Sequence, residues 1–496
     1  MKTTILTMAI ALALSLSVPA AAKVTAQQKC DSLKLTASAK LAQCRLVALA
    51  KHEKKPDETR RDEAFAKCES KFQTVYDKAE LKAPEDTAAE QRDQCSTYGN
   101  AESIATYLST SADTVRGLIG SSVSETPRLV SGEDFICWLA SNGGVWCLGS
   151  GDYGQLGDGL FADSADVAVQ PVGLDSGVVA IAAGEQHACA IKDDASLWCW
   201  GENNDGQIGD GTTVNAGSPV EVQASEVEIV RVGLGEEHSC AVDNAGGTYC
   251  WGQNSDGQVG IGTNDAKVLV PTLVASLTVP MHDVRAGDNF TCALSQSGSV
   301  ACWGQGDSGR LGNGSDAESL APVWVTGLSD GNVTQLEVGW SSSCAAVQGG
   351  SLYCWGRNNV GQLGIGTTED SNVPVEVTAL GSGVRAFSSG YRNVCAIDAD
   401  GALYCWGSNS YGALGDGSEE DSSTPMRVGG VLAYAGDPGY ATITEVDVGG
   451  TNISCAVTDT DDRLCWGKIP ISEEGSSWTT AAFPLRIQPF VDVDPF

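Results

Sequence analysis

Cysteine supplies the most regular chemistry in this chain of 496 residues. Most of its 18 cysteines form pairs whose two members lie ten residues apart. Thiols at this spacing can form disulfides, whereas a zinc site needs C-x-x-C spacing or recurring histidines, and neither accompanies the pairs. We therefore expect seven disulfides and no metal site. The expected bonds join Cys137 to Cys147, Cys189 to Cys199, Cys240 to Cys250, Cys292 to Cys302, Cys344 to Cys354, Cys395 to Cys405 and Cys455 to Cys465.

The segment between the two cysteines of a pair predicts a β-hairpin. If Cys395 and Cys405 face each other, the loop consists of residues 399–401. The third residue of such a loop takes a left-handed conformation, which glycine adopts most easily. Glycine stands at this position in every copy except two, which have Ala195 and Asp461. Facing residues without mutual backbone hydrogen bonds approach closely, and this closeness suits a disulfide.

A glycine-rich segment follows the second cysteine, as in Trp200-Gly-Glu-Asn-Asn-Asp-Gly-Gln-Ile-Gly209. Its fourth residue is asparagine in some copies and glycine in others, an exchange that predicts positive φ. Its glutamine, for example Gln207, is predicted to turn inward as a plug. A proline then follows in every copy, and we expect it to open a strand at the edge of a sheet. The prolines are Pro171, Pro219, Pro271, Pro322, Pro374, Pro425 and Pro484.

The elements that must position these residues repeat along the chain. The second cysteine recurs every 51 or 52 residues, and after 60 before the last copy. Each unit contains four short strand-like stretches and no helical period. Such units bury their apolar faces only by stacking on their neighbours. The sequence therefore predicts an all-β fold, a seven-bladed β-propeller over residues 121–496.

The order Gly-x-x-His-x-Cys-Ala, hairpin, Cys-Trp-Gly-x-Asn-x-x-Gly-Gln-Leu-Gly-x-Gly resembles the regulator of chromosome condensation repeat. The resemblance covers residues 129–490 and is most specific in copies two to six. Copy one has Leu148 in place of the tryptophan, and copy seven loses the glycine-rich segment after Gly467. The resemblance implies a seven-bladed propeller. It also implies either exchange-factor activity on a small GTPase, as in the founding nuclear member, or inhibition of a secreted enzyme such as a β-lactamase.

The first 22 residues are typical of a secretory signal. Lys2 precedes an apolar run from Ile5 to Val18, and residues 20–22 offer an A-x-A cleavage site. Disulfide-rich chains belong to oxidising compartments. We expect a secreted or periplasmic protein with no membrane span after signal cleavage.

Residues 23–120 have a different composition and predict a small α-helical module stapled by disulfides. A helical hairpin centred near Pro56 places Cys44 and Cys68 at equal distances from the turn. We expect a disulfide between Cys44 and Cys68, with a second one between Cys30 and Cys95 closing a larger loop, although two other connectivities remain open. A docking or oligomerising head and a plain spacer are both consistent with this composition.

Charge is distributed unevenly. Residues 23–100 carry 15 basic and 13 acidic residues, whereas residues 101–496 carry 14 and 50. Such an acidic propeller repels phosphate backbones, so we expect no nucleic-acid binding. The acidity is consistent with solubility or adaptation to salt, and also with the capture of a basic partner or of cations.

No residue pattern points to catalysis or to a cofactor. His187 and His238 share a repeat position that other copies fill with Phe, Ser, Asn or Ile, which predicts packing. Carboxylates at a propeller mouth could serve a glycosidase, but no pair of them stands out. Tyr434 and Tyr440, in the longer connection before copy seven, are candidate partner-binding residues because aromatic side chains are enriched in interfaces. The sequence favours a non-enzymatic propeller that binds an unknown protein partner.

Overall fold

The structure is a computed structural model that describes residues 129–222, 227–328, 332–429, 442–450, 452–459, 462–469 and 479–486. All of them belong to the second of two units, residues 124–496. The predicted signal segment (1–22), the helical module (23–120) with Cys30, Cys44, Cys68 and Cys95, and the pair Tyr434 and Tyr440 lie outside the described residues.

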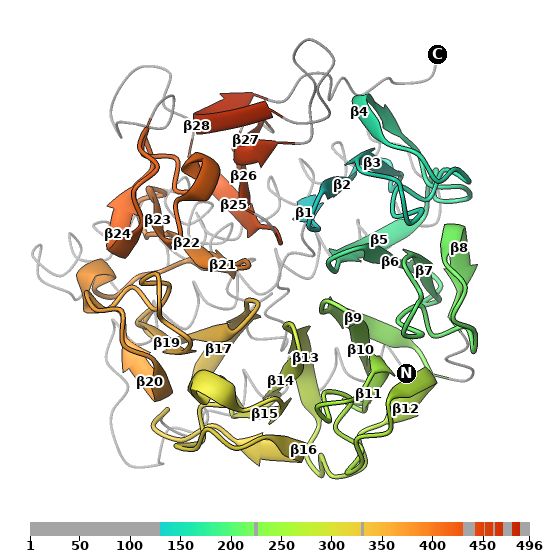
Figure 1. Cartoon of the computed structure of the whole chain (residues 1–496), viewed down its shortest axis with the longest axis horizontal. Helices are drawn as coiled ribbons and strands as arrows, with labels where there is room; N and C mark the ends of the chain where they lie inside the picture. Colours follow the sequence, from blue (N-terminus) through green and yellow to red (C-terminus); the bar gives the residue numbers. More distant parts are fainter. Residues whose placement is uncertain are drawn as a thin grey trace, which may run out of the picture. The chain divides into compact units, whose positions relative to one another are not determined.

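Seven four-stranded antiparallel sheets surround a central channel, as predicted (Figure 1). Each blade uses four consecutive strands of the chain. The first, innermost strands are β1 (Leu129–Ser131), β5 (Val178–Ala183), β9 (Ile229–Leu234), β13 (Met281–Ala286), β17 (Val333–Val338), β21 (Ala386–Ser389) and β25 (Ile443–Val448). The second strands are β2 (Phe135–Leu139), β6 (His187–Lys192), β10 (His238–Asp243), β14 (Phe290–Ser295), β18 (Ser342–Val347), β22 (Asn393–Ile397) and β26 (Ile453–Thr458).

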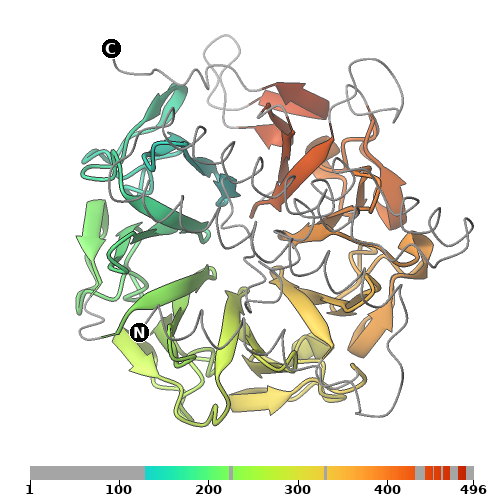
Figure 2. The same cartoon turned by 180° about the vertical axis from the view of Figure 1, so that it is seen from behind.

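The two outer strands complete each blade (Figure 2). The third strands are β3 (Val145–Gly149), β7 (Leu197–Gly201), β11 (Thr248–Gln253), β15 (Val300–Gly304), β19 (Leu352–Gly356), β23 (Leu403–Gly407) and β27 (Arg463–Ile469). The fourth strands are β4 (Ser164–Val169), β8 (Ala216–Glu221), β12 (Lys267–Leu273), β16 (Ser319–Trp324), β20 (Ser371–Glu376), β24 (Ser422–Arg427) and β28 (Thr479–Arg486). The described part also has three 3-10 turns, η1 (Asp307–Gly309), η2 (Thr378–Leu380) and η3 (Ser410–Gly412). None of its helices is long and apolar enough to cross a membrane.

The cysteines of each pair face each other across the second and third strands, as the ten-residue spacing predicts. Cys240 pairs with Cys250 in the ladder of β10 and β11, and a disulfide joins them. Their Cα atoms are 4.1 Å apart, the short separation of a non-hydrogen-bonded pair. The other six blades have the same bond, which joins Cys137 to Cys147, Cys189 to Cys199, Cys292 to Cys302, Cys344 to Cys354, Cys395 to Cys405 and Cys455 to Cys465.

The predicted hairpin loop is also present. Gly401 has a φ of 80° at the third loop position, and the other glycines at this position are similar. Ala195, predicted as an exception, adopts the same left-handed conformation with a φ of 67°. The turn therefore dictates the backbone even where the residue is poorly suited to it. Asp461, the second exception, lies outside the described residues.

Two predictions are wrong, one about the glycine-rich segment and one about the prolines. The fourth residue of the glycine-rich segment has negative φ, −112° at Asn409 and −104° at Gly306. Asparagine is used there for its side chain. Nδ2 of Asn203 donates to the carbonyl of Val214 at 3.1 Å, and Oδ1 accepts from the amide of Ile208 at 3.0 Å. In copy one the backbone fills this space, because a Cβ on Gly151 would overlap the carbonyl of Ala162.

The prolines do not open the fourth strands, which is the second wrong prediction. Pro219 lies inside β8, at a register irregularity where the ladder to β7 skips from Val220 to Ala216. Five other prolines have the same place in their strands, and Pro171 follows β4. The fourth strand is the outer edge of its blade, where a missing amide donor leaves no ladder bond unmade.

The hydrophobic core lies between blades. Each core cluster contains residues of two neighbouring blades, as where Trp200 of blade two packs with Leu156 of blade one. Within the described residues every blade consists of four consecutive strands, and the ring closes where blade seven packs on blade one. The amide of Gly450 donates to the carbonyl of Gly132 at 3.0 Å, and Lys468 contacts Asp134 at 2.6 Å.

Candidate functional site

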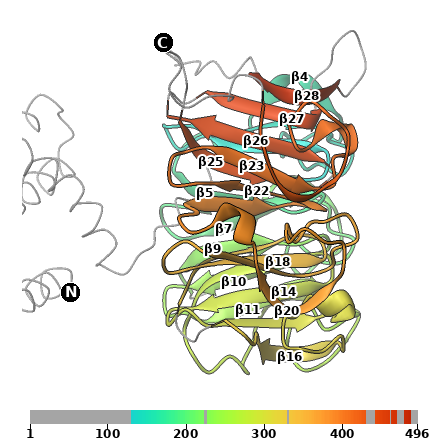
Figure 3. The same ribbon diagram turned by 90° about the vertical axis from the view of Figure 1, so that its left-hand side faces the viewer.

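One end of the channel is surrounded by the loops that join the first and second strands. The third strand of a blade runs parallel to its first, so the glycine-rich loops after the third strands lie on the same face. We call it the mouth face, and the opposite one, with the hairpin loops, the hairpin face. Figure 3 shows the strands running between the two faces.

One backbone position recurs around the mouth, directly after the glycine that ends each first strand. Its amide donates to a carbonyl of the next blade in most loops, as from Glu185 to Gly235 at 3.3 Å and from Trp340 to Gly390 at 3.2 Å. The backbone therefore has the same task in different blades, while the side chain is free to vary. The residues at this mouth position, in blade order, are Glu133, Glu185, Glu236, Asp288, Trp340, Tyr391 and Gly450.

The four carboxyl groups interact in a row, because Glu133 and Glu236 each contact Glu185, and Glu236 also contacts Asp288. Burial raises the pKa of Glu185 to about 10, and the hydrogen bond and negative charge of Glu236 add to this rise. Burial and Glu236 also raise the pKa of Asp288, to about 8. Burial opposes ionisation of Glu236 too, but hydrogen bonds from Asp288, Glu185 and Trp340 outweigh it and lower its pKa. These shifts favour the negative charge on Glu236, and Glu185 and Asp288 on either side of it keep their protons more readily.

Two aromatic side chains complete the mouth. The rings of Trp340 and Tyr391 stack with centroids 4.3 Å apart. Nε1 of Trp340 donates to Oε2 of Glu236 across the channel at 3.3 Å. The guanidinium groups of Arg392 and Arg357 lie 5.6 Å and 6.0 Å from the Trp340 ring. The aromatic faces are thus already in contact with groups of the protein itself.

Charge divides the surroundings of the mouth into two sectors. Two further loop positions flank the mouth position: the residue after it, and the residue after the glycine of each third strand. In blades one to four these flanking positions include Asp134, Glu202 and Glu237. Burial raises the pKa of Glu237 to about 7, and the charge of Asp205 adds to this effect. In blades five to seven the described residues at these positions are Ser341, Arg357, Arg392, Ser408 and Lys468.

A cavity of about 130 Å³ lies directly inside the mouth. A second cavity, of about 140 Å³, lies deeper in the channel. In the deeper cavity, Arg285 contacts Asp283 at 3.1 Å and Glu337 at 3.3 Å. These ion pairs lie on inner strands and can do no chemistry on a macromolecule at the surface. Both cavities are lined by the same mostly apolar collar, formed by Ser131, Ala183, Leu234, Ala286, Val338, Ser389 and Val448.

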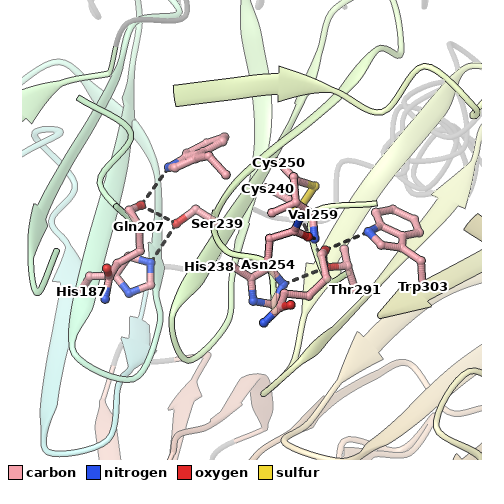
Figure 4. Close-up of a disulfide and its surroundings, with 12 residues drawn as sticks. His187, Gln207, His238, Ser239, Cys240, Cys250, Asn254, Val259, Thr291 and Trp303 are labelled. Atoms are coloured by element: carbon pink, nitrogen blue, oxygen red, sulfur yellow. Dashed lines mark hydrogen bonds between the residues drawn. A yellow bond between two sulfur atoms is a disulfide. The ribbon is translucent and has the colours of Figure 1, made fainter. Parts of the chain in front are cut away.

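The two histidines serve packing, as predicted. Ser239 donates to the carbonyl of Gln207 at 2.8 Å, so its oxygen accepts from Nε2 of His187 at 2.9 Å (Figure 4). His238 makes the equivalent contact with Thr291 at 2.8 Å. Burial lowers the pKa of His187 to about 3 and that of His238 to about 4, so both rings are neutral.

The predicted inward plug supports the seam between blades. Gln207 is fully buried, and its carbonyl accepts Nε1 of Trp251 from the next blade at 2.8 Å. Five further seams have the same indole-to-carbonyl bond. The fourteen cysteines of the blades are likewise buried. These repeated residues therefore stabilise the ring. No group of three His, Cys, Asp or Glu side chains is arranged to hold a metal ion within the described ranges.

Sequence reasoning missed the carboxyl cluster, although a signal was present. In blades one to six, the mouth position is the fourth residue before the first cysteine of the pair. Aligning the copies on that cysteine would have shown four successive acids followed by two aromatics. Blade seven hides the pattern, because one extra residue separates Gly449 from Ile453.

Comparison with known proteins gives a consistent result. A model described as the regulator of chromosome condensation (RCC1) repeat matches residues 142–191, 194–242, 245–294, 297–346, 349–397 and 400–456. The ultraviolet-B receptor UVR8 of Arabidopsis thaliana is 28% identical over 355 residues, which cover 71% of this chain and 76% of UVR8. The human E3 ubiquitin-protein ligase HERC2 is 30% identical over 310 residues, 61% of this chain but only 6% of HERC2.

Solved structures show the same fold. Human WBSCR16 aligns with a TM-score of 0.59 at 22% identity, covering 67% of this chain and 86% of that one. Prp20p of Saccharomyces cerevisiae, a protein studied for its binding to Gsp1p and histones, aligns with a TM-score of 0.57 at 22% identity, covering 68% and 86%.

Proposed function

The chain belongs to the regulator of chromosome condensation repeat family, and from this premise we propose that it is a secreted or periplasmic protein that binds another protein and catalyses no reaction. A fold of this kind hosts many functions, so the function depends on the residues of the site. Prp20p binds proteins, which supports a binding role for a similar ring.

One observation carries the proposal. At the mouth position the backbone makes the same kind of bond from blade to blade, yet its side chains change from carboxylates in blades one to four to aromatics in blades five and six. Folding does not require this change. A rigid scaffold with side chains that vary around one opening is suited to recognition. Trp and Tyr at its centre are the residue types that dominate binding energy in interfaces.

Cysteine chemistry supports the proposed compartment. Seven disulfides inside the blades are stable in an oxidising environment and rare in the cytosol. The predicted signal segment supports the same location. Exchange-factor activity on a small GTPase is therefore not favoured, because it would require the reducing cytosol. The acidic propeller also disfavours a nucleic-acid partner.

The test is affinity capture from the extracellular or periplasmic fraction with the full chain. We expect wild type to retain a discrete protein and Trp340→Ala to lose it. Trp324→Ala, which removes a tryptophan 46% exposed on the outer strand of blade four, is the matched control and should retain the partner. Equal capture by both variants would exclude the mouth as the binding site, and substrate turnover by the purified protein would overturn the non-enzymatic assignment.

A further inference from the structure

We propose that the mouth cavity receives the primary ammonium group of a lysine side chain from the protein partner. This inference rests on the proposed function and names the chemistry that the partner must present. It starts from Glu185, Glu236 and Asp288, whose carboxyl groups hydrogen-bond to one another at the channel opening.

The cluster has no structural task that explains it. The amides of these residues support the ring, but their side chains only contact one another, Trp340 and neighbouring polar groups. Bringing carboxyl groups together and out of water disfavours their ionisation. The cationic group nearest to them is Arg310, whose Nη1 is 3.9 Å from Asp288. A second cation at the opening would favour ionisation of Glu185 and Asp288.

The cavity behind the cluster contains an independent sign of an absent ligand. Ser389 lines both cavities and is 9% exposed, yet its Oγ has no hydrogen-bond partner among the residues that the structure describes. An unsatisfied buried hydroxyl is unfavourable unless a ligand or water reaches it. An ammonium group has three donors, enough for Glu236, one neighbouring carboxyl group and the Ser389 side of the cavity.

Lysine fits the opening better than arginine. A guanidinium gains much of its affinity by stacking on an aromatic face. The Trp340 ring is stacked on Tyr391, with Arg357 and Arg392 beside it, so an entering guanidinium would meet like charge. A cavity of about 130 Å³ suits a compact ammonium on a narrow stem. The apolar part of the collar, such as Leu234, stops the charge at the carboxyl cluster.

Binding should release protons. The groups that face the ammonium are Glu133, Glu185, Glu236, Asp288 and Arg310, and His238 behind them is neutral. An ammonium favours the ionised form of each carboxyl group that it contacts. We therefore expect affinity to rise as the pH is raised from about 6 to about 8, where Asp288 titrates.

The probe is Nα-acetyl-lysine methylamide, titrated into the full chain at about 0.1 M salt by saturation-transfer NMR, so that distant surface charges are screened. We expect Glu236→Gln to weaken binding about tenfold, the loss of one charged hydrogen bond. Asp288→Asn should fold normally and lessen the pH dependence, because it removes the carboxyl group to which that dependence is assigned. Asp400→Asn removes the same charge from the hairpin face and should change affinity less than about twofold, because exposed distant charges are screened.

Two further probes identify the source of the amine. The arginine analogue should bind more weakly than the lysine probe, and glycine methylamide, with only a free α-amine, should bind more weakly still. No binding of the lysine probe to wild type, or equal loss in Glu236→Gln and Asp400→Asn, would overturn the inference. If Trp340→Ala still abolishes capture of the partner in that case, the proposed function stands and only the lysine assignment fails.

Discussion

At the seams between blades one contact recurs, the bond from an indole such as that of Trp251 to a buried carbonyl such as that of Gln207. At the channel mouth, the mouth position also recurs once per blade, but it carries glutamate, aspartate, tryptophan, tyrosine or glycine. Both regions repeat once per blade, so the fold offers each the same freedom. The repeated seam residues hold the blades together, whereas the varied mouth residues are the ones that we propose for recognition. We infer that residues which repeat in every blade belong to the scaffold, and that residues which differ from blade to blade at one position belong to the binding site.

In the described part of the ring, one seam between blades lacks the recurring indole-to-carbonyl bond. Copy one has Leu148 in place of the tryptophan, and copy seven lacks the glycine-rich loop. In the ring these two departures meet at one seam, between blades seven and one, where Trp138 and Trp146 pack instead.

The largest effect should come from breaking a seam. Trp251→Ala removes a fully buried indole and leaves the Gln207 carbonyl without it. We expect a loss of about 3–5 kcal/mol in the free energy of unfolding, measured by denaturant titration. Trp340→Ala, at the mouth, should cost less than about 1.5 kcal/mol. Equal losses would mean that the mouth is as structural as the seam.

A smaller loss should follow from opening one disulfide. The double variant Cys240→Ala with Cys250→Ala removes the cross-link of blade three. We expect its free energy of unfolding to fall by about 2–3 kcal/mol under non-reducing conditions, since a short closed loop constrains the unfolded chain. The same change at Cys395 and Cys405 serves as the comparison and should cost a similar amount. An unchanged stability in both blades would contradict this view of the scaffold.

The carboxyl cluster at the mouth should make the free energy of unfolding depend on pH. In the unfolded chain Glu185 ionises near pH 4.5, but in the folded chain it keeps its proton to about pH 10. Its contribution to stability is therefore fully present at low pH and declines as the pH rises between these values. Glu185→Gln does not titrate, so above about pH 7 it should be more stable than wild type, by on the order of 1 kcal/mol.

Thermal unfolding of both proteins at several pH values measures this difference, which should widen as the pH increases. Asp400→Asn, on the hairpin face, is the charge-matched control and should follow wild type. A constant difference between Glu185→Gln and wild type would show that the carboxyl groups of the mouth do not share protons.

The smallest effect should come from the hairpin turn of blade two. Ala195 has a φ of 67°, a conformation that costs alanine energy but not glycine. Ala195→Gly should raise the free energy of unfolding by about 0.5–1 kcal/mol. Ala399→Gly, at the first loop position of blade six, should bring no gain. A loss of stability in Ala195→Gly would mean that contacts of the methyl group outweigh the strain.

The sequence was sufficient where one residue type has one physical use. Facing cysteines fixed the hairpin register, and glycine at the third loop position located its turn. Predictions from the sequence were wrong where one residue type has several structural uses. Asparagine can support positive φ or bond through its side chain, and only the loop around Asn203 shows which applies. Proline tolerates several places on an edge strand, so Pro219 inside β8 could not be located by type alone.

The mouth was hidden for another reason. Glu185, Glu236 and Asp288 are about fifty residues apart in sequence, and only the closed ring brings their carboxyl groups together. An acid at a loop position is ordinary in an acidic chain. Whether such an acid belongs to a cluster depends on its neighbours from other blades. The repeat period identifies these neighbours but does not show that their side chains are in contact.

The most direct measurement is site-specific photo-crosslinking in the native fraction. A photoreactive amino acid is placed at Tyr391 on the mouth face in one protein and at Asp400 on the hairpin face in another. We expect a discrete cross-linked partner from position 391 and none from position 400. A partner captured from position 400 but not from position 391 would contradict the assignment of recognition to the mouth.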